Sequence, residues 1–394
     1  MNHFLVIVST IFLVTVLFQW TLIRLMLPQR LSKTGNALIS LVLTAGINAI
    51  PFLYMTSTRT FDQLPWWHRE FIIFPYAILM VASAVSGIFL LAVWCATLMV
   101  SALWPGFDRK RRTFLSFSGR TAVGASLAVL GFGTYYESKA TEISRLTLSY
   151  RGLHPDLSGL RLVQITDFHA GALISFETIS DVVSRANALK PDLIVLTGDY
   201  VNNNPDYIRG CLALLDELKA PVGVFGVYGN HDYYTGINAM IAGFAKTRIC
   251  VLRDSYQAPK GLEGLLNIIG VDDPVSNWAA DAQFKDLSKL SRLVAPDHFN
   301  LLLSHRPGIF DASQNWKAQL TLAGHTHGGQ VILPGIGERG LSLAGLFVTY
   351  THGLYASGKD PEVRMYVNRG IGTIVAPVRL FCKPEITEIT LKRA

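Results

Sequence analysis

The chain has 394 residues, of which 50% are hydrophobic and only 16% are charged, so it is more apolar than a typical soluble protein. Residues 1–137 carry ten Lys and Arg against four Asp and Glu, whereas residues 138–394 carry 25 against 24, so the net charge of +7 belongs almost wholly to the N-terminal part. The balanced charge of the larger part argues against a nucleic-acid partner. The four cysteines form no C-x-x-C pair, and we expect free or buried thiols, with a disulfide among Cys211, Cys250 and Cys382 left open.

Four apolar stretches precede residue 137. Residues 4–23 contain no charge and are long enough to cross a hydrocarbon core of ~30 Å. Residues 37–55 and 71–104 form two more, and Pro75 would separate an interfacial entry from the spanning helix in the longer one. Residues 121–136 form a shorter fourth stretch, rich in Gly and Ala. We therefore predict a membrane domain at 1–136, a linker at 137–141 and a second domain at 142–394.

The placement of basic residues predicts the orientation of these spans. The first and third loops are basic, whereas the second balances two basic residues with two acidic ones. With four spans, the second domain lies on the extracytoplasmic side, as in a bacterial inner-membrane protein; if the fourth stretch does not span, it lies inside. The segment from Arg111 to Leu115 resembles a twin-arginine export signal, with an ordinary cytoplasmic loop as the alternative.

The second half alternates strand-like and helix-like segments, which predicts an α/β fold. Residues 142–149 alternate apolar and polar positions, and residues 176–189 and 208–218 have helical spacing. Short apolar runs occupy residues 160–166, 191–197, 222–227, 301–304 and 320–323. Polar residues follow directly after these five runs, at the strand ends where α/β sheets bind ligands.

The residues at the five strand ends have the chemistry of metal ligands. They are Asp167, His169, Asp199, Asn230, His231, His305, His325 and His327, and they include five of the ten histidines of the chain. Each motif alone is more often structural, but together they combine imidazole, carboxylate and amide oxygen, which suit Mn²⁺, Fe²⁺ and Zn²⁺. Such a set is too large for one ion and fits two ions bridged by a carboxylate. Two such ions ~3.5–4 Å apart activate a bridging water and clamp a phosphate.

The set of motifs resembles the calcineurin-like metallophosphoesterases, in their membrane-associated bacterial branch, over residues 140–394. The resemblance rests on Asp167-Phe168-His169, Gly198-Asp199, Gly229-Asn230-His231-Asp232, Ser304-His305 and the run from Gly324 to Gln330. It implies two packed mixed β-sheets flanked by helices. It also implies one metal on Asp167, His169 and His327, a second on Asn230, His305 and His325, Asp199 as the bridge, and His231 as the catalytic residue facing the phosphate.

Several nearby residues have two interpretations. Asp232 would orient His231 or cap a turn, and we favour the cap. Arg306 and His352 are candidate substrate-binding residues, with an ion pair and a loop role as their alternatives. Arg369 and Arg379 would form structural pairs or contact a headgroup. Residues 200–204 lack the acidic residue that many members of the family carry after Gly198-Asp199, so contacts to the substrate there are not predicted.

The sequence therefore predicts a membrane-anchored phosphoesterase that needs two divalent ions, with Mn²⁺ preferred over Fe²⁺ or Zn²⁺. It would hydrolyse a phosphoester, phosphodiester or pyrophosphate bond by attack of a metal-bridging hydroxide. A site held near the bilayer suggests a lipid- or envelope-linked substrate. The alternative is a membrane sensor or transport-associated protein with a regulatory metal-binding domain. Transport itself is disfavoured because the spans contain almost no ionisable residues.

Overall fold

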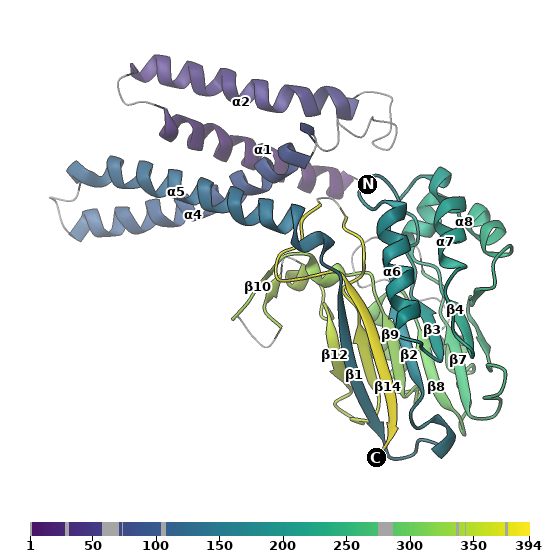
Figure 1. The fold of residues 1–394 in the computed structure, drawn as a ribbon. Coiled ribbons are helices and arrows are strands. Elements are labelled where there is room, and N and C mark those ends of the chain that lie inside the picture. The colour runs from purple at the N-terminus through teal and green to yellow at the C-terminus, as the bar shows by residue number, and fades with distance from the viewer. Residues whose placement is uncertain are drawn as a thin grey trace. The chain divides into compact units, whose positions relative to one another are not determined.

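The computed structural model describes residues 2–27, 31–56, 71–72, 74–103, 108–274, 287–335, 339–342, 344–374 and 377–394 (Figure 1). The chain divides into two compact units, Met1–Tyr136 and Glu137–Ala394. The second predicted loop of the membrane domain, residues 57–70, lies outside the described residues. All four cysteines are free.

The first unit contains four long helices at the four predicted apolar stretches. They are α1 (Asn2–Met26), α2 (Lys33–Thr56), α4 (Phe74–Leu103) and α5 (Asp108–Tyr135). Within the described residues, one segment, Ile78–Val100 of α4, is long and apolar enough to cross a membrane, and α1 holds a shorter apolar segment, Phe12–Met26. The twin-arginine-like segment lies at the start of α5. Four spans therefore remain a prediction.

Helix α2 turns its polar side chains inward and its apolar side chains outward. Asn36, Ser40 and Thr44 recur every fourth residue and are all buried, at 6%, 0% and 4% exposure. On the other faces Leu38 and Val42 are 60% and 63% exposed. Helices that pack against one another in lipid show this arrangement, because the apolar surface faces acyl chains and polar groups bond between helices.

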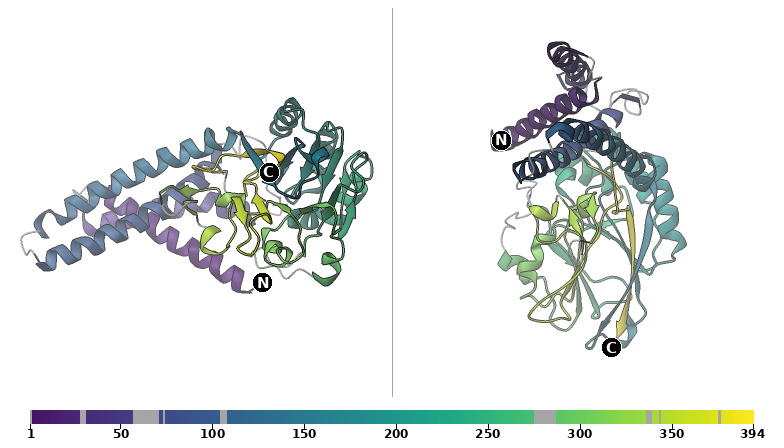
Figure 2. Two further views of the ribbon diagram at one scale, coloured as in Figure 1. Left: turned by 90° about the horizontal axis from the view of Figure 1, so that it is seen from below. Right: turned by 90° about the vertical axis from the view of Figure 1, so that its left-hand side faces the viewer.

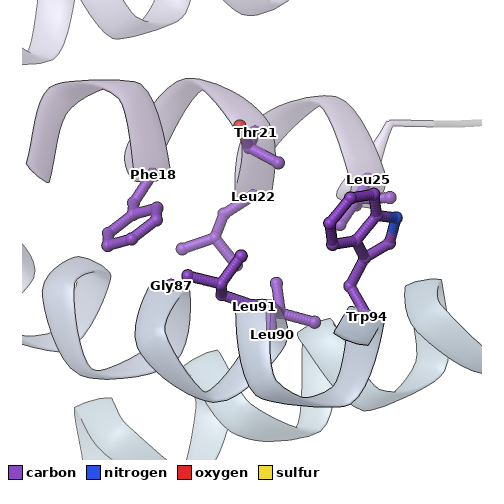
Figure 3. Close-up of a pocket in the computed structure, with 8 residues that line it drawn as sticks. All are labelled: Phe18, Thr21, Leu22, Leu25, Gly87, Leu90, Leu91 and Trp94. Carbon is purple, nitrogen blue, oxygen red and sulfur yellow. The ribbon is translucent and has the colours of Figure 1, made fainter. Parts of the chain in front are cut away.

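Hydrogen bonds between helices continue this polar stripe. The side-chain amide of Asn48 donates to Gln19 Oε1 of α1 at 2.7 Å, and the hydroxyl of Tyr76 in α4 donates to Asn48 Oδ1 at 2.8 Å. Helices α1 and α4 also approach closely at Gly87, where a Cβ atom would lie 2.2 Å from the Phe18 ring. An apolar groove of about 430 Å³ lies beside this crossing (Figure 3).

The second unit contains two six-stranded sheets. In the first sheet the order is β1 (Glu142–Tyr150), β14 (Glu385–Arg393), β2 (Arg161–Ile165), β3 (Leu193–Leu196), β4 (Gly223–Gly226), β5 (Cys250–Val251). In the second sheet the order is β12 (Gly353–Ala356), β13 (Arg364–Val367), β9 (Leu320–Ala323), β8 (Phe299–Leu303), β7 (Leu266–Gly270), β6 (Ser255–Gln257). A short hairpin, β10 (Ile332–Leu333) and β11 (Leu341–Ser342), follows β9.

The sheets pack face to face, with helices outside (Figure 2). One buried cluster joins Leu162 and Val195 of the first sheet to Leu301 and Leu322 of the second. The outer face of the first sheet packs against α6 (Phe176–Ala188), α7 (Ile208–Leu215) and α8 (Asn230–Phe244). The predicted architecture of two packed mixed sheets flanked by helices is confirmed.

The first and last strands of the second unit pair with each other. Strand β14 lies parallel to β1 and antiparallel to β2, so the C-terminal segment completes the first sheet. The predicted linker begins with a short helix, η4 (Glu137–Lys139), whose Glu137 is buried and accepts a hydrogen bond from the amide of Cys382 at 3.1 Å.

An ion pair at the junction of the two sheets joins β14 to the segment after β13. The guanidinium of Arg369 lies 2.9 Å from the Glu385 carboxylate and also contacts Glu142, so Arg369 forms one of the predicted structural pairs. Glu385 is completely buried and accepts a further hydrogen bond from the Tyr366 hydroxyl. Burial raises the pKa of Glu385, but the charge and hydrogen bond of Arg369 outweigh burial, so its pKa lies below the usual value.

Replacement of Arg369 by Met would leave the Glu385 charge buried without its partner. We expect a loss of about 3–5 kcal/mol, equivalent to roughly 6–20 °C in the unfolding temperature of the second unit measured by calorimetry in detergent. The lowered pKa of Glu385 stabilises the wild type above that pKa, so the deficit should shrink as the pH falls through it and protonates Glu385 in both proteins.

Arg145 is the matched control, because it also pairs with a glutamate of β14, Glu388, but is 65% exposed. Replacing Arg145 by Met should cost less than about 1 kcal/mol. Equal losses for the two variants would show that the burial of Glu385 does not set the strength of its pair.

Candidate metal centre

The eight predicted site residues lie together at the carboxyl ends of strands from both sheets. Asp167 and His169 follow β2, Asp199 follows β3, and Asn230 and His231 begin α8 directly after β4. In the second sheet, His305 follows β8, and His325 and His327 follow β9. All of them are at most 2% exposed except His231 and His325, which are half-buried.

One group of donor atoms surrounds His169. Its Nε2 lies 3.0 Å from His327 Nε2 and 3.4 Å from Asp199 Oδ2. His327 Nε2 lies 3.4 Å from Asp167 Oδ1. Asp167, His169 and His327 therefore offer three converging ligand atoms, as a metal site requires.

A second group surrounds His305. Its Nε2 lies 3.1 Å from Asn230 Oδ1, 3.1 Å from His325 Nδ1 and 3.2 Å from Asp199 Oδ2. The same oxygen of Asp199 therefore stands between the two groups. The other oxygen, Oδ1, accepts the backbone N–H of His231 at 2.9 Å, which fixes the rotation of the carboxylate.

These distances fit metal coordination. Metal–ligand bonds of ~2.0–2.2 Å place neighbouring ligand atoms about 3 Å apart, as observed in both groups. Imidazole nitrogens and carboxylate oxygens facing one another at this distance are acceptors without enough protons to share, and a cation between them removes that repulsion. The residues fit two divalent cations, with Asp199 shared between them.

The outer nitrogens of two histidines are held by backbone carbonyls. His305 Nδ1 lies 2.8 Å from the oxygen of Thr197, and His327 Nδ1 lies 3.1 Å from the oxygen of Gly372. A carbonyl accepts only from N–H, so Nδ1 carries a proton in both rings and Nε2 is the atom left to bind a cation. His231 Nδ1 is held in the same way by Asn202, at 2.7 Å. The loop that lacks the acidic residue of many relatives thus positions the predicted catalytic histidine through its backbone.

The electrostatics keep the two central carboxylates ionised. Burial raises the pKa of Asp167 and Asp199, but the histidines around them, chiefly His327 and His305 respectively, outweigh it and hold both pKa values below the usual range. Burial lowers the pKa of His305, but the charge of Asp199 raises it to about 10. Burial lowers the pKa of His327 to about 3. The pocket is therefore built to hold positive charge against Asp199.

Comparison with known proteins agrees with this geometry. Residues 160–329 match the family model described as "Calcineurin-like phosphoesterase". The uncharacterized metallophosphoesterase YkuE of Bacillus subtilis (strain 168) is 34% identical over 294 residues, covering 72% of this chain and 97% of that protein. The chain belongs to the calcineurin-like phosphoesterase family.

Two other relatives are described as a metallophosphoesterase or as having a metallophosphoesterase domain. A metallophosphoesterase of Aquifex aeolicus (strain VF5) is 28% identical and covers 67% of this chain and 97% of its own. A "Transmembrane protein with metallophosphoesterase domain" of Bos taurus is 27% identical over 80% of this chain and 70% of its own length. Some members of the family are thus transmembrane proteins.

The candidate metal centre is built on strained backbone. Asp167, His169, Asp199, His325 and His327 all have positive φ, between 49° and 73°. This left-handed conformation costs a non-glycine residue of the order of 1–3 kcal/mol and persists only where its surroundings enforce it. Neighbouring glycines make room: a Cβ at Gly229 would lie 2.2 Å from Asp199 Oδ1, and a Cβ at Gly324 would lie 2.3 Å from Asp167 Oδ2.

Asp232 holds one of these turns in place. Its carboxylate accepts the backbone N–H groups of Asp199 and Tyr200 at 3.0 Å and of Gly229 at 2.8 Å. The predicted capping role is confirmed, and it extends to the turn that carries the bridging carboxylate. Burial and the charge of Asp199 raise the pKa of Asp232 to about 8, against the effect of the N–H donors.

Arg379 holds a second turn, whereas the sequence predicted a structural pair or a headgroup contact for it. Its completely buried guanidinium donates to the carbonyls of Cys382, Arg369, Gly370 and Gly372. The Gly372 carbonyl also orients His327, so Arg379 supports a metal ligand through one intervening group. No local signal in the sequence distinguishes such an arginine from a surface one.

The two predicted substrate-binding residues have different surroundings. Arg306 is completely buried and its Nε donates to Asp273 at 2.8 Å, so the ion pair that was its alternative is present, inside the protein. Substrate binding by Arg306 stays a prediction. His352 is half-buried beside Thr351, whose carbonyl accepts the hydroxyl of Thr326, between His325 and His327. Burial lowers the pKa of His352, so it is neutral at neutral pH.

Replacing Asp232 by Ala tests the support of the bridging residue. The variant leaves three buried N–H groups unsatisfied and frees the turn that carries Asp199. We expect metal affinity to fall about 10–100-fold, as for other residues that orient ligands, measured by titration of the chelator-stripped protein with Mn²⁺.

The exposed Asp206 is the control, since it lies in the next turn of the same loop but contacts no ligand, and Asp206→Ala should bind Mn²⁺ as the wild type does. An Asp232→Ala variant with unchanged affinity would mean that the turn holds its strained shape without the cap.

Proposed function

We propose that this protein is a membrane-anchored, two-metal phosphoesterase that cleaves a phosphoester, phosphodiester or pyrophosphate bond of a lipid- or envelope-linked substrate. The observation that carries the proposal is the position of Asp199 Oδ2, 3.4 Å from His169 Nε2 and 3.2 Å from His305 Nε2. A single carboxylate oxygen between two histidine groups is the arrangement that a pair of bridged cations needs.

The residues divide the chemistry between them. Two divalent cations, once bound, acidify a water molecule and neutralise charge on the phosphate. Asp167, His169 and His327 would hold one cation, and Asn230, His305 and His325 the other. The donor set of nitrogen and oxygen atoms without cysteine favours Mn²⁺, with Fe²⁺ or Zn²⁺ as substitutes.

His231 supplies the proton chemistry. It is half-buried, so one side faces solvent, and its ring lies edge-on to His169 with centroids 4.6 Å apart. Burial lowers its pKa, whereas the negative charge of a phosphate beside it favours the protonated ring. In that form Nδ1–H donates to Asn202 and Nε2–H is available to the leaving oxygen of the substrate.

The helical unit supports membrane anchoring. Its polar-inward, apolar-outward α2 and the apolar length of α4 suit a bilayer, and the bovine relative is named as a transmembrane protein. The basic residues before α2 and at the start of α5 favour a cytoplasmic position for these loops. We infer four spans in a bacterial inner membrane and an extracytoplasmic phosphoesterase unit.

Turnover by the full chain in detergent tests the proposal, with bis-p-nitrophenyl phosphate as substrate and Mn²⁺ as metal. Asp199→Asn should lose both activity and bound metal, because the amide offers only one oxygen and no charge. His231→Ala should lose about 10²–10⁴ in kcat and keep its metal, as expected for a proton donor that is not a ligand. Chelation should abolish turnover and Mn²⁺ should restore it.

His154→Ala is the control, since this exposed histidine caps a short helix, η5 (Pro155–Leu157), and belongs to none of the metal groups. It should keep full activity. A wild type without turnover in any of Mn²⁺, Fe²⁺, Zn²⁺, Co²⁺ and Ni²⁺ would overturn the proposal. A His231→Ala protein as active as the wild type would favour a regulatory metal-binding domain.

A further inference from the structure

Four large apolar side chains are exposed on the second unit around the β10–β11 hairpin. Leu333, Leu341, Phe347 and Phe381 are 51%, 37%, 66% and 58% exposed, and together we call them the apolar rim. Strand β10 projects from the two sheets (Figure 1). Its register with β11 pairs Leu333 directly with Leu341. Val331 forms a bridge with Leu380, which brings Phe381 to the same region.

The apolar rim adjoins the metal centre. The ligand His327 begins a short helix, η8 (His327–Gly329), and a Cβ at Gly329 would lie 2.6 Å from Ser342 and 3.3 Å from Ala344. Ser342 is the last residue of β11, and Ala344 begins η9 (Ala344–Leu346), which leads to Phe347. The thiol of Cys382, next to Phe381, lies 3.3 Å from the carbonyl of His327. Both segments of the rim are thus packed against the backbone of a ligand.

The conformation of Phe381 is unfavourable for folding alone. Its φ is 53°, in the left-handed region that bulky side chains rarely adopt. Burial of the ring does not offset this strain, because the residue is 58% exposed. Strain at an exposed aromatic side chain points to a role outside the fold.

The apolar rim also lies where the chain enters the second unit. The amide of Cys382 donates to the carboxylate of Glu137, which directly follows Tyr136, the last residue of the helical unit. Phe381 is therefore one residue from the contact that ties down the start of the second unit. If the helices before Tyr136 lie in a membrane, as proposed, Phe381 lies next to the residue at which the chain leaves them.

We propose that the apolar rim inserts into the boundary between headgroups and acyl chains of the bilayer and so places the mouth of the metal centre at the membrane surface. This inference rests on the membrane anchoring proposed above. Its partner is lipid, because the two most exposed Phe side chains in the described part of the second unit belong to the apolar rim, which adjoins the start of that unit. Such side chains lower the free energy of an interfacial segment by burying apolar area among the lipids.

Photocrosslinking of the full chain in nanodiscs of phosphatidylethanolamine and phosphatidylglycerol tests the contact without any need for activity. p-Benzoylphenylalanine replaces Phe347 or Phe381 in the test variants and Tyr256 in the matched control. Tyr256 is aromatic and 59% exposed, but it lies in β6, the edge strand at the opposite end of the second sheet from β12. Lipid adducts seen by mass spectrometry should form at positions 347 and 381 and be absent at 256. Adduct levels equal to the control, or adducts to a second copy of the chain, would overturn the inference.

Kinetics of a double variant, Phe347→Ser with Phe381→Asn, test what the contact does. Asn tolerates positive φ, so the turn at 381 should persist. With hexadecyl p-nitrophenyl phosphate in the nanodisc, KM should rise about tenfold with little change in kcat, because the variant loses local concentration at the surface. With soluble bis-p-nitrophenyl phosphate, kcat and KM should both stay within about twofold, since the metal centre is intact.

The outcomes separate the two proposals. A wild type inactive on both substrates would overturn the phosphoesterase function, while the crosslinks would still report the membrane contact. Equal KM values of wild type and double variant for the bilayer substrate would overturn the role of the apolar rim, while activity would still support the phosphoesterase.

Discussion

The whole site depends on one carboxylate that is shared between two sheets. Asp199 follows a strand of the first sheet, and its Oδ2 lies within 3.4 Å of His169 from that sheet and within 3.2 Å of His305 from the other. These contacts form only when the two sheets pack face to face with the carboxyl ends of their parallel strands on the same edge. The cross-sheet core that includes Leu162, Val195 and Leu301 therefore determines the position of the donor atoms as well as the stability of the fold.

Gathering these groups opposes folding in two ways. Two ionised carboxylates are taken out of water, and five of the site residues adopt a left-handed backbone. Asp232 and Arg379 offset part of this cost, since each binds several backbone groups of a turn that carries or orients a ligand. The guanidinium of Arg379 is itself a buried charge, and the backbone carbonyls to which it donates stabilise it. The buried carboxylates and the left-handed backbone thus lower local stability, and the same contacts fix the positions of the donor atoms.

The sequence predicted the residues of the site better than the contacts that hold them. The candidate ligands could be picked out as residues that lie together, because each stands just after an apolar strand and the carboxyl ends of parallel strands converge. The ion pair of Arg306 with Asp273 could not, because the partners are 33 positions apart and neither has a periodic pattern. The position of β14 between β1 and β2 could not be predicted either. A half-buried strand has the same alternating sequence pattern at the edge of a sheet and in its middle. Positive φ at Asp167 or His325 leaves no mark in the sequence, because neither is a glycine.

The loop around Cys382 connects the start of the second unit to the candidate metal centre. Its amide binds Glu137 at the start of the second unit, its thiol contacts the carbonyl of the ligand His327, and its carbonyl accepts from Arg379. Cys382 therefore joins the start of the second unit to the backbone of the predicted ligand His327. Within the second unit, this connection brings the segment that starts the unit next to the loop that packs against the backbone of His327. The exposed and strained Phe381 then lies where an interfacial side chain would be useful, which the stability of the fold alone does not explain.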